Sequence, residues 1–478
     1  MGVRELKNNL FNKSQKLLKE IEQNKDIFIL SNSTVDGIIS GCIILKSIYD
    51  NKGNAAMRCS CESIESNIEE IIQDNHDFYI FTDFNSDIID KIDKIFHQGN
   101  YLFINIDPIN KSNNSTYENI INPWLYNLNG KEEISTSGLA YFLINNFDIN
   151  SHQLSYLPII SAISKDQDIG ENRSLIGLNE EILQTSLKSN IIEQKKRLTI
   201  SEIETMSITN VLENNIIHYI KEITWNNEYS LKVIKDSHLP SSLDGNIKPF
   251  NELNEKEFIM ICDSIERLLQ ENSKLKNNKI IKDLLFGYNY ILIAEENEGF
   301  IKNIRSFVKA INSCLNAQQN GLALSLCLGD RGEILKDVSN LVIKNNNLIK
   351  KISSQLFGEK WRFYDDQETI FINGEGILNI SNLNTFMSFM ERSISFADRL
   401  ICLRILDSEE FYKFIIIKTK YCNFNLVSIK EKIKQVLDNE DIQIIGNNTL
   451  EIKIPTGNLE DFLSNIKKII INEKFSQS

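Results

Sequence analysis

The sequence lacks the features that would mark a membrane, secreted or nucleic-acid-coating protein. Among its 478 residues no apolar run approaches the roughly 18 residues of a membrane-spanning helix, and the polar start does not resemble a signal peptide. Its formal charge of -13 at pH 7 is wrong for a general nucleic-acid coat, although a local basic groove is compatible with it. We therefore expect a cytoplasmic protein that meets no membrane.

Histidine and paired cysteine are also scarce. The chain has five scattered histidines and eight cysteines, of which only Cys59 and Cys61 form a close pair. A structural zinc site needs two such pairs, or one pair with added histidines. We interpret the cysteines as reduced, partly buried thiols and expect no zinc or redox centre.

Strand-like apolar runs alternate with helical stretches over residues 27–110 and again after residue 360. This alternation is typical of a doubly wound parallel sheet. Polar helices are expected to dominate between about 191 and 271. The length suits about three domains. We predict an α/β protein with a parallel-sheet domain, a mainly helical insertion that returns to the first core, and a second α/β domain, over residues 1–190, 191–330 and 331–478.

Two shorter segments carry expectations of their own. The apolar run 322–328 ends at Gly329 and is expected to be a strand. The only tight basic cluster, residues 195–197, is expected to lie on the solvated face of a helix and not at a phosphate site.

Three aspartates stand at or shortly after the ends of apolar runs in the first 110 residues. These are Asp36, Asp83 and Asp107. The C-terminal ends of adjacent parallel strands open on one crevice, so the three carboxylates are expected to converge there and could hold a hard divalent cation. Aspartates at strand ends also commonly cap a helix, and that simpler role needs no ligand.

The residues around these acids form recognisable motifs. Residues 32–40 read Asn-Ser-Thr-Val-Asp-Gly-Ile-Ile-Ser, Asp107 is followed by Pro-Ile, and residues 161–167 read Ser-Ala-Ile-Ser-Lys-Asp-Gln. Residues 326–331 read Leu-Cys-Leu-Gly-Asp-Arg. Near the end, Gly-Asn-Asn-Thr-Leu-Glu at 446–451 precedes an Ile-Pro pair and an amphipathic stretch.

In this order, and over nearly the whole chain, these motifs resemble those of the DHH phosphoesterases. The resemblance is to the archaeal RecJ-like proteins that include the GINS-associated nuclease, which are themselves similar to the DHH-derived subunit of the eukaryotic replicative helicase. It implies a DHH-type sheet domain at the start and a DHHA1-like α/β domain at the C-terminus. In this family Mn²⁺ or Mg²⁺, held by aspartate and histidine, would drive phosphodiester hydrolysis.

The catalytic positions depart from the family pattern. Asn32 and Thr34 replace a histidine and an aspartate of the first motif, and both histidines that should follow Asp107 are absent. Lys165 replaces a metal-binding aspartate, unless the register slips by one and Asp166 takes that place. The resemblance therefore implies that Asn32, Thr34 and Lys165 are vestigial, and that no cofactor is required. At most one weak metal site is expected, from Asp36, Asp83 and Asp107, with Asp166 as a further candidate ligand.

The C-terminal substrate loop is altered as well. The family has Gly-Gly-His there, whereas this chain has Gly446, Asn447 and Asn448. Consecutive glycines let a backbone approach a phosphate closely, and asparagine side chains narrow that approach. Both halves of the family's cleft are thus changed in the same direction.

The leading hypothesis is a catalytically inactive RecJ-like protein that serves as an accessory or scaffold subunit of an archaeal replicative helicase. The resemblance implies the GINS complex and the MCM helicase as partners, with single-stranded DNA as a further candidate, and a cytoplasmic location at the nucleoid when the replisome assembles. One alternative is a single-strand exonuclease or oligonucleotide phosphodiesterase that depends on Mn²⁺ or Mg²⁺, held at a metal site with fewer ligands than the family's. Another is a regulatory protein that binds a nucleotide in the old cleft without turnover.

Overall fold

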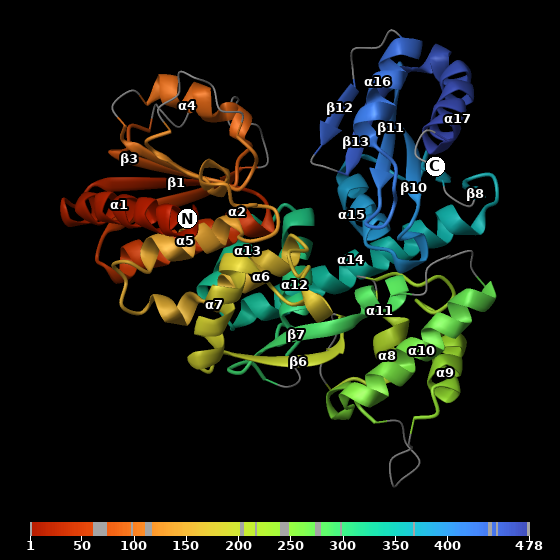
Figure 1. Ribbon diagram of the computed structural model, residues 1–478, viewed down its shortest axis with the longest axis horizontal. Helices are drawn as coiled ribbons and strands as arrows, with labels where there is room; N and C mark the ends of the chain where they lie inside the picture. The colour runs from red at the N-terminus through yellow and green to blue at the C-terminus, as the bar shows by residue number, and fades with distance from the viewer. Residues whose placement is uncertain are drawn as a thin grey trace. The chain divides into compact units, whose positions relative to one another are not determined.

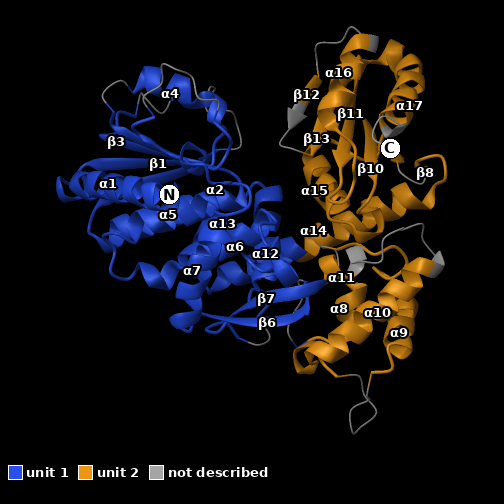
Figure 2. Ribbon diagram, viewed as in Figure 1, with its two compact units in different colours: residues 1–205, 286–342 blue, residues 206–285, 343–478 orange. Residues whose placement is uncertain are grey.

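The chain folds into two compact units, each built from two separate stretches of sequence (Figure 2). Unit 1 comprises residues 1–205 and 286–342, and unit 2 comprises residues 206–285 and 343–478. The division at 190 and 330 stays a prediction. The computed structural model describes residues 2–60, 74–96, 99–109, 117–200, 205–215, 218–239, 248–272, 279–296, 299–366, 369–437, 442–445 and 448–475.

A five-stranded parallel sheet forms the centre of unit 1, in the order β2-β1-β3-β4-β5. Neighbouring side chains of each strand point to opposite faces, and both faces are buried: Ile27 and Ile29 enter one core, whereas Phe28 and Leu30 enter another. The predicted α/β class with a parallel sheet is therefore confirmed. The strands are β1 (Asp26–Asn32), β2 (Asn54–Ser60), β3 (Phe78–Thr82), β4 (Tyr101–Ile104) and β5 (Ile120–Ile121).

Helices cover both faces of this sheet (Figure 1). Helices α1, α2 and α5 pack on one face, and α4 packs on the other. Unit 1 also contains helices α6, α7, α12 and α13 and an antiparallel pair of strands, β6 and β7. The bounds are α1 (Gly2–Glu22), α2 (Val35–Asp50), α4 (Ile89–Ile95), α5 (Thr136–Ile144), α6 (Tyr156–Ser164), α7 (Gly177–Lys188), β6 (Ile192–Leu198), β7 (Phe286–Leu292), α12 (Ile304–Asn316) and α13 (Asn320–Leu328).

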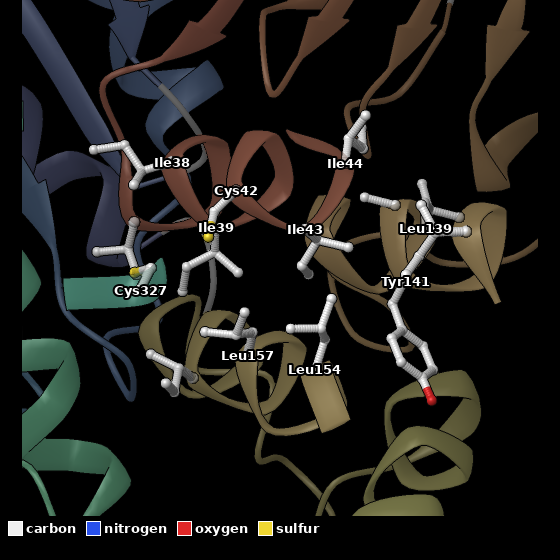
Figure 3. Packing of buried hydrophobic residues seen from close by; sticks show 14 of the residues in the cluster. Ile38, Ile39, Cys42, Ile43, Ile44, Leu139, Tyr141, Leu154, Leu157 and Cys327 are labelled. Atoms are coloured by element: carbon white, nitrogen blue, oxygen red, sulfur yellow. The ribbon is translucent and has the colours of Figure 1, made fainter. Parts of the chain in front are cut away.

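Helix α2 is the centre of the unit 1 core. It is apolar nearly all round, as expected of a helix that is enclosed on every side. Figure 3 shows Ile39, Cys42 and Ile43 of α2 packed with Leu157 of α6 and Cys327 of α13. This burial fixes the start of α2, where the candidate site lies.

Two local expectations are wrong. Residues 322–328 belong to helix α13, because Ala323, Leu326 and Cys327 are buried at helical spacing and Gly329, with φ of 99°, ends the helix in the left-handed conformation. Residues 195–197 lie on strand β6, because this segment pairs with Gly287–Asn289 of β7. Arg197 is buried in that strand. An unbroken apolar or basic run has no period that distinguishes the two structures.

Unit 2 contains a six-stranded mixed sheet in the order β12-β13-β11-β10-β9-β8. Only β9 and β10 pair in parallel among its described strands. Helix α15 and the last part of α14 pack on one face, and α16 and α17 pack on the other. The strands are β8 (Phe363–Asp366), β9 (Thr369–Asn373), β10 (Leu400–Leu406), β11 (Phe411–Lys418), β12 (Ile442–Ile445) and β13 (Thr449–Pro455).

Helices account for the rest of unit 2, and α14 begins in unit 1 and ends in unit 2. None of the helices within the described ranges is long and apolar enough to cross a bilayer. The bounds are α8 (Ile208–Glu213), α9 (Asn227–Asp236), α10 (Glu255–Asn272), α11 (Lys279–Leu285), α14 (Glu333–Gly358), α15 (Ile380–Glu391), α16 (Leu426–Leu437) and α17 (Leu459–Phe475).

Candidate functional site

The candidate site lies where β1 and β3, which pair in parallel, reach their C-terminal ends. The Asn32 side chain donates a hydrogen bond to the backbone oxygen of Asp83 at 2.9 Å and ties the two strand ends together. Helix α2 begins immediately afterwards, and Gly37 allows it to start this close to β1. A Cβ atom at Gly37 would lie 2.2 Å from the backbone oxygen of Asn32. The glycine of the Asp-Gly pair is therefore required on steric grounds, because a side chain at this position would clash with the end of β1.

Asp36 is completely buried in the first turn of α2, and its carboxylate holds the start of a different helix, α5. Its two oxygens accept hydrogen bonds from the backbone N–H groups of Thr136 and Ser137 at 2.9 and 2.8 Å. The start of a helix carries unpaired N–H groups and a partial positive charge, so a carboxylate is stabilising there. Thr34 caps α2 itself, since its hydroxyl accepts from Gly37 N at 2.9 Å. The helix-capping role of strand-end aspartates is thus present, on a helix distant in sequence.

Asp83 follows β3 directly and stands in the left-handed region, with φ of 61°. Its carboxylate accepts hydrogen bonds from the hydroxyls of Thr34, at 2.5 Å, and Thr136, at 2.8 Å. Thr136 therefore contacts both acids, through its backbone N–H to Asp36 and through its hydroxyl to Asp83. At this position, where the family resemblance implies an aspartate, the Thr34 hydroxyl donates a hydrogen bond that an ionised carboxylate could not donate.

Lys165 supplies the positive charge of the site. It follows the last turn of α6, and its ammonium lies 3.4 Å from either oxygen of Asp83 and 4.0 Å from Asp36 Oδ2. Burial lowers the pKa of this ammonium, but Asp83, Asp36 and Asp107 outweigh it, so the pKa lies above its usual value and Lys165 stays charged. Asp166, the alternative register, is exposed, with φ of 54°.

Burial and the neighbouring charge of Asp83 raise the pKa of Asp36 above its usual value, while Lys165 and the two α5 amides oppose the shift. Asp107 is half-buried after β4, and its backbone oxygen accepts from the Asn122 side chain at 2.8 Å. Burial and Asp83 raise the pKa of Asp107 too. Both shifts come mainly from burial of the carboxyl groups, and the charge of Asp83 adds to them.

A pair of divalent cations does not fit this donor set. Asp36 and Asp83 already accept two backbone N–H groups, two hydroxyls and an ammonium. A divalent cation about 4 Å from that ammonium would be repelled by roughly 8 kcal/mol at an effective dielectric constant of about 20. Across the described ranges, no three His, Cys, Asp or Glu side chains form a group that could hold a metal ion.

Of the substrate loop predicted in the C-terminal domain, Gly446 and Asn447 lie outside the described residues. Asn448 is exposed just before β13, and its side chain donates to Glu391 Oε1 of α15 at 3.0 Å. This contact holds Asn448 against its own unit.

A buried ion cluster that no sequence motif indicated is centred on Asp168, three residues after Lys165. Asp168 accepts hydrogen bonds from Arg173 at 2.8 and 3.0 Å and from Arg305 of α12 at 2.6 Å. Burial alone would raise the pKa of Asp168, but the two guanidinium groups outweigh it and hold that pKa well below its usual value. The preceding residue, Gln167, is also buried and donates to the backbone oxygens of Gly130 and Ile134 at 3.0 and 3.1 Å. The motif around Lys165 is therefore anchored on two sides.

Comparison with known proteins supports the fold. No protein-family model matches the sequence. An uncharacterised protein of Methanocaldococcus jannaschii is 27% identical over 162 residues, a match that spans 33% of this chain and 36% of that protein.

Solved structures match over much more of the chain. Cdc45 of Entamoeba histolytica has a TM-score of 0.60 at 12% identity, over 96% of this chain and 99% of that one. The exonuclease RecJ bound to manganese has a TM-score of 0.52 at 10% identity, over 96% and 93%. The DHH domain of a member of a ribosomal-protein family has a TM-score of 0.52 at 12% identity, over 98% and 92%. The chain therefore has the RecJ-like DHH fold that its motifs predicted.

Proposed function

We propose, from the RecJ-like DHH fold of this chain, that it is a non-hydrolytic accessory or scaffold subunit of an archaeal replicative helicase. The observation that carries the proposal is the ammonium of Lys165 at 3.4 Å from Asp83 and 4.0 Å from Asp36. In this view Lys165 does internally what a bound cation would do, which is to neutralise the aspartates at the strand ends. The acids are kept because they hold α2, α5 and α6 together, and turnover is not needed for that.

The choice of a helicase role rests on the comparison with Cdc45, which aligns over nearly the full length of both chains. The partners we propose are the GINS complex and the MCM helicase, with single-stranded DNA as a further ligand. The chain's formal charge of -13 favours contacts with basic protein surfaces over bulk DNA binding. We place the protein in the cytoplasm, at the nucleoid when the complex assembles.

Affinity purification of the tagged full-length chain from its native host tests the partner. We expect subunits of GINS and MCM to co-purify, and the tag expressed alone provides the control. Recovery of neither complex, at salt concentrations low enough to keep charged interfaces intact, would overturn this assignment.

A nuclease assay tests the absence of turnover. The purified chain is incubated with Mn²⁺ and labelled single-stranded DNA or RNA, beside the isosteric variants Asp36→Asn and Asp83→Asn. We expect no hydrolysis by the wild type above the level of either variant. Hydrolysis that both substitutions abolish, in variants that keep the wild-type circular dichroism spectrum, contradicts the proposal.

Such hydrolysis would instead establish the second candidate, a single-strand exonuclease or oligonucleotide phosphodiesterase with a reduced metal site. The retained aspartates and the manganese-bound RecJ neighbour favour that candidate. It requires the Lys165 ammonium to leave Asp83 before a cation can bind, and nothing in the charge balance of the site favours that departure.

A further inference from the structure

Unit 2 contains a pocket that the site at the strand ends does not explain. It has a volume of about 350 Å³, within the range of small-ligand sites, and lies between the β8 edge of the six-stranded sheet and helix α17. Asn448, the described residue of the segment where the family resemblance places its substrate loop, lies just before β13, which pairs with β12 at the opposite edge of this sheet. The two are therefore separate places.

The charge of the lining is opposite to that of the chain. Arg362, Arg404 and Lys467 line the pocket, and none of the described lining residues is an aspartate or glutamate. The whole chain, by contrast, has 65 acidic against 52 basic residues. A concave surface lined by positive charges raises the local concentration of anions.

Lys467 is the cation best placed to take a ligand. Its ammonium lies 5.5 Å from the ring centre of Tyr364 and 5.4 Å from that of Phe371, and it makes no ion pair within the described part of the chain. Arg404 is already paired with Glu375 at 3.1 Å, although its Nε has no hydrogen-bond partner among the described residues. An exposed ammonium above two rings is free to meet an anionic group.

The aromatic residues add a flat, open surface. Trp361 is 65% exposed and Tyr364 is 54% exposed, which is unusual for side chains of this size. The Arg362 guanidinium lies 4.0 Å from the Trp361 ring centre. It is held there by hydrogen bonds to the backbone oxygens of Asn373 and Glu375, at 3.3 and 2.7 Å, and by Glu359 at 3.0 Å. One face of the indole is thus supported, and the exposure of the ring leaves area for a second planar group.

We propose that this pocket binds a nucleotide unit, with its base stacked on Trp361 and its phosphate at Lys467. A nucleotide joins a planar ring to an anion, and the pocket joins an exposed aromatic surface to cations. Proteins commonly bind single strands by such stacking beside positive charge. The unit can come from a free nucleotide or from single-stranded nucleic acid. The inference rests on unit 2 alone and does not depend on the proposed function.

Two probes distinguish the sources: AMP and a fluorescein-labelled oligothymidylate, each titrated against the full chain. Binding of the oligothymidylate alone assigns the site to single strands, and binding of AMP assigns it to free nucleotides. For the bound probe, Trp361→Ala is expected to weaken affinity roughly 5- to 150-fold, the range for one stacked base, with Trp361→Phe restoring part of it. Lys467→Gln is expected to weaken binding and to flatten its salt dependence, by a slope of about 0.7 for the oligothymidylate.

Lys468→Gln is the matched control, because Lys468 is exposed on the same helix and does not line the pocket. Thermal midpoints equal to the wild type confirm that the variants fold. Equal affinity in the wild type, Trp361→Ala and Lys467→Gln overturns the proposal, as does the absence of binding by either probe. Selective binding of an acidic, tryptophan-containing peptide, lost in Trp361→Ala, assigns the pocket to a protein partner and overturns it as well.

Discussion

Replacing Lys165 with methionine should destabilise unit 1, because the substitution leaves two buried aspartates without their cation. At a separation of about 4 Å, each ion pair contributes an attraction on the order of 4 kcal/mol at an effective dielectric constant of about 20. The Lys165 side chain is 34% exposed, so solvent screening reduces this attraction, and the burial of the ammonium offsets more of it. We expect a net loss of about 2 kcal/mol in the free energy of unfolding. This is below the roughly 3–5 kcal/mol lost when one partner of a fully buried ion pair is removed.

This loss should depend on pH in a defined direction. The pKa of Asp36 is already raised, and removal of Lys165 raises it further. A carboxyl group with a raised folded pKa contributes stability below its unfolded pKa, near 3.8, and loses that contribution as the pH rises through the folded value. The difference between wild type and Lys165→Met should therefore be smaller at pH 5 than at pH 8.

Urea unfolding, followed by circular dichroism at both pH values, measures this difference. Lys165→Arg keeps the charge and should recover most of the stability. Lys7→Met removes an exposed ion pair with Glu181, at 2.6 Å, and should cost at most about 1 kcal/mol. A Lys165→Met variant as stable as Lys7→Met, with no change between pH 5 and pH 8, would refute the electrostatic reasoning.

Three further predictions follow from the same contacts. Asp168→Asn should lower the free energy of unfolding by about 3–5 kcal/mol, because two buried guanidinium groups lose their carboxylate; a loss below about 1 kcal/mol in urea unfolding contradicts this. Because the folded pKa of Asp168 is depressed, wild-type stability should fall as the pH drops below about 3.8, and this fall should be smaller in Asp168→Asn; parallel pH profiles for the two proteins would argue against it. Thr136→Val should cost about 1–2 kcal/mol, since Asp83 loses a hydroxyl donor, whereas Thr185→Val, at a half-buried position of α7 away from the site, should change stability by less than about 0.5 kcal/mol.

The sequence was sufficient to predict the α/β class, because short apolar strand runs alternate with longer helical stretches in the first part of the chain. It was also sufficient to select Asp36, Asp83 and Lys165 for attention, through their places in the motifs. The structure adds that Asp36 binds the start of α5, 100 residues further along the chain. Local periodicity contains no information about such a contact, because it depends on how distant segments pack.

The same limit explains Arg305, which pairs with Asp168 across 137 residues of sequence and carries no recognisable motif. The error at 322–328 has a different cause. The run contains enough apolar residues for either a strand or a helix, and only packing against α2 and α12 selects positions 323, 326 and 327 for burial. Tertiary contacts, and not local preference, decide between the two structures there.

Anomalous diffraction from crystals grown with Mn²⁺ tests the central claim most directly. The claim is that the Lys165 ammonium occupies the charge position at Asp36 and Asp83 that divalent cations would otherwise take. We predict no manganese peak between these two carboxylates, with the Lys165 ammonium still within ion-pair distance of Asp83. Two manganese ions bridged by the aspartates, with Lys165 displaced, would contradict the account.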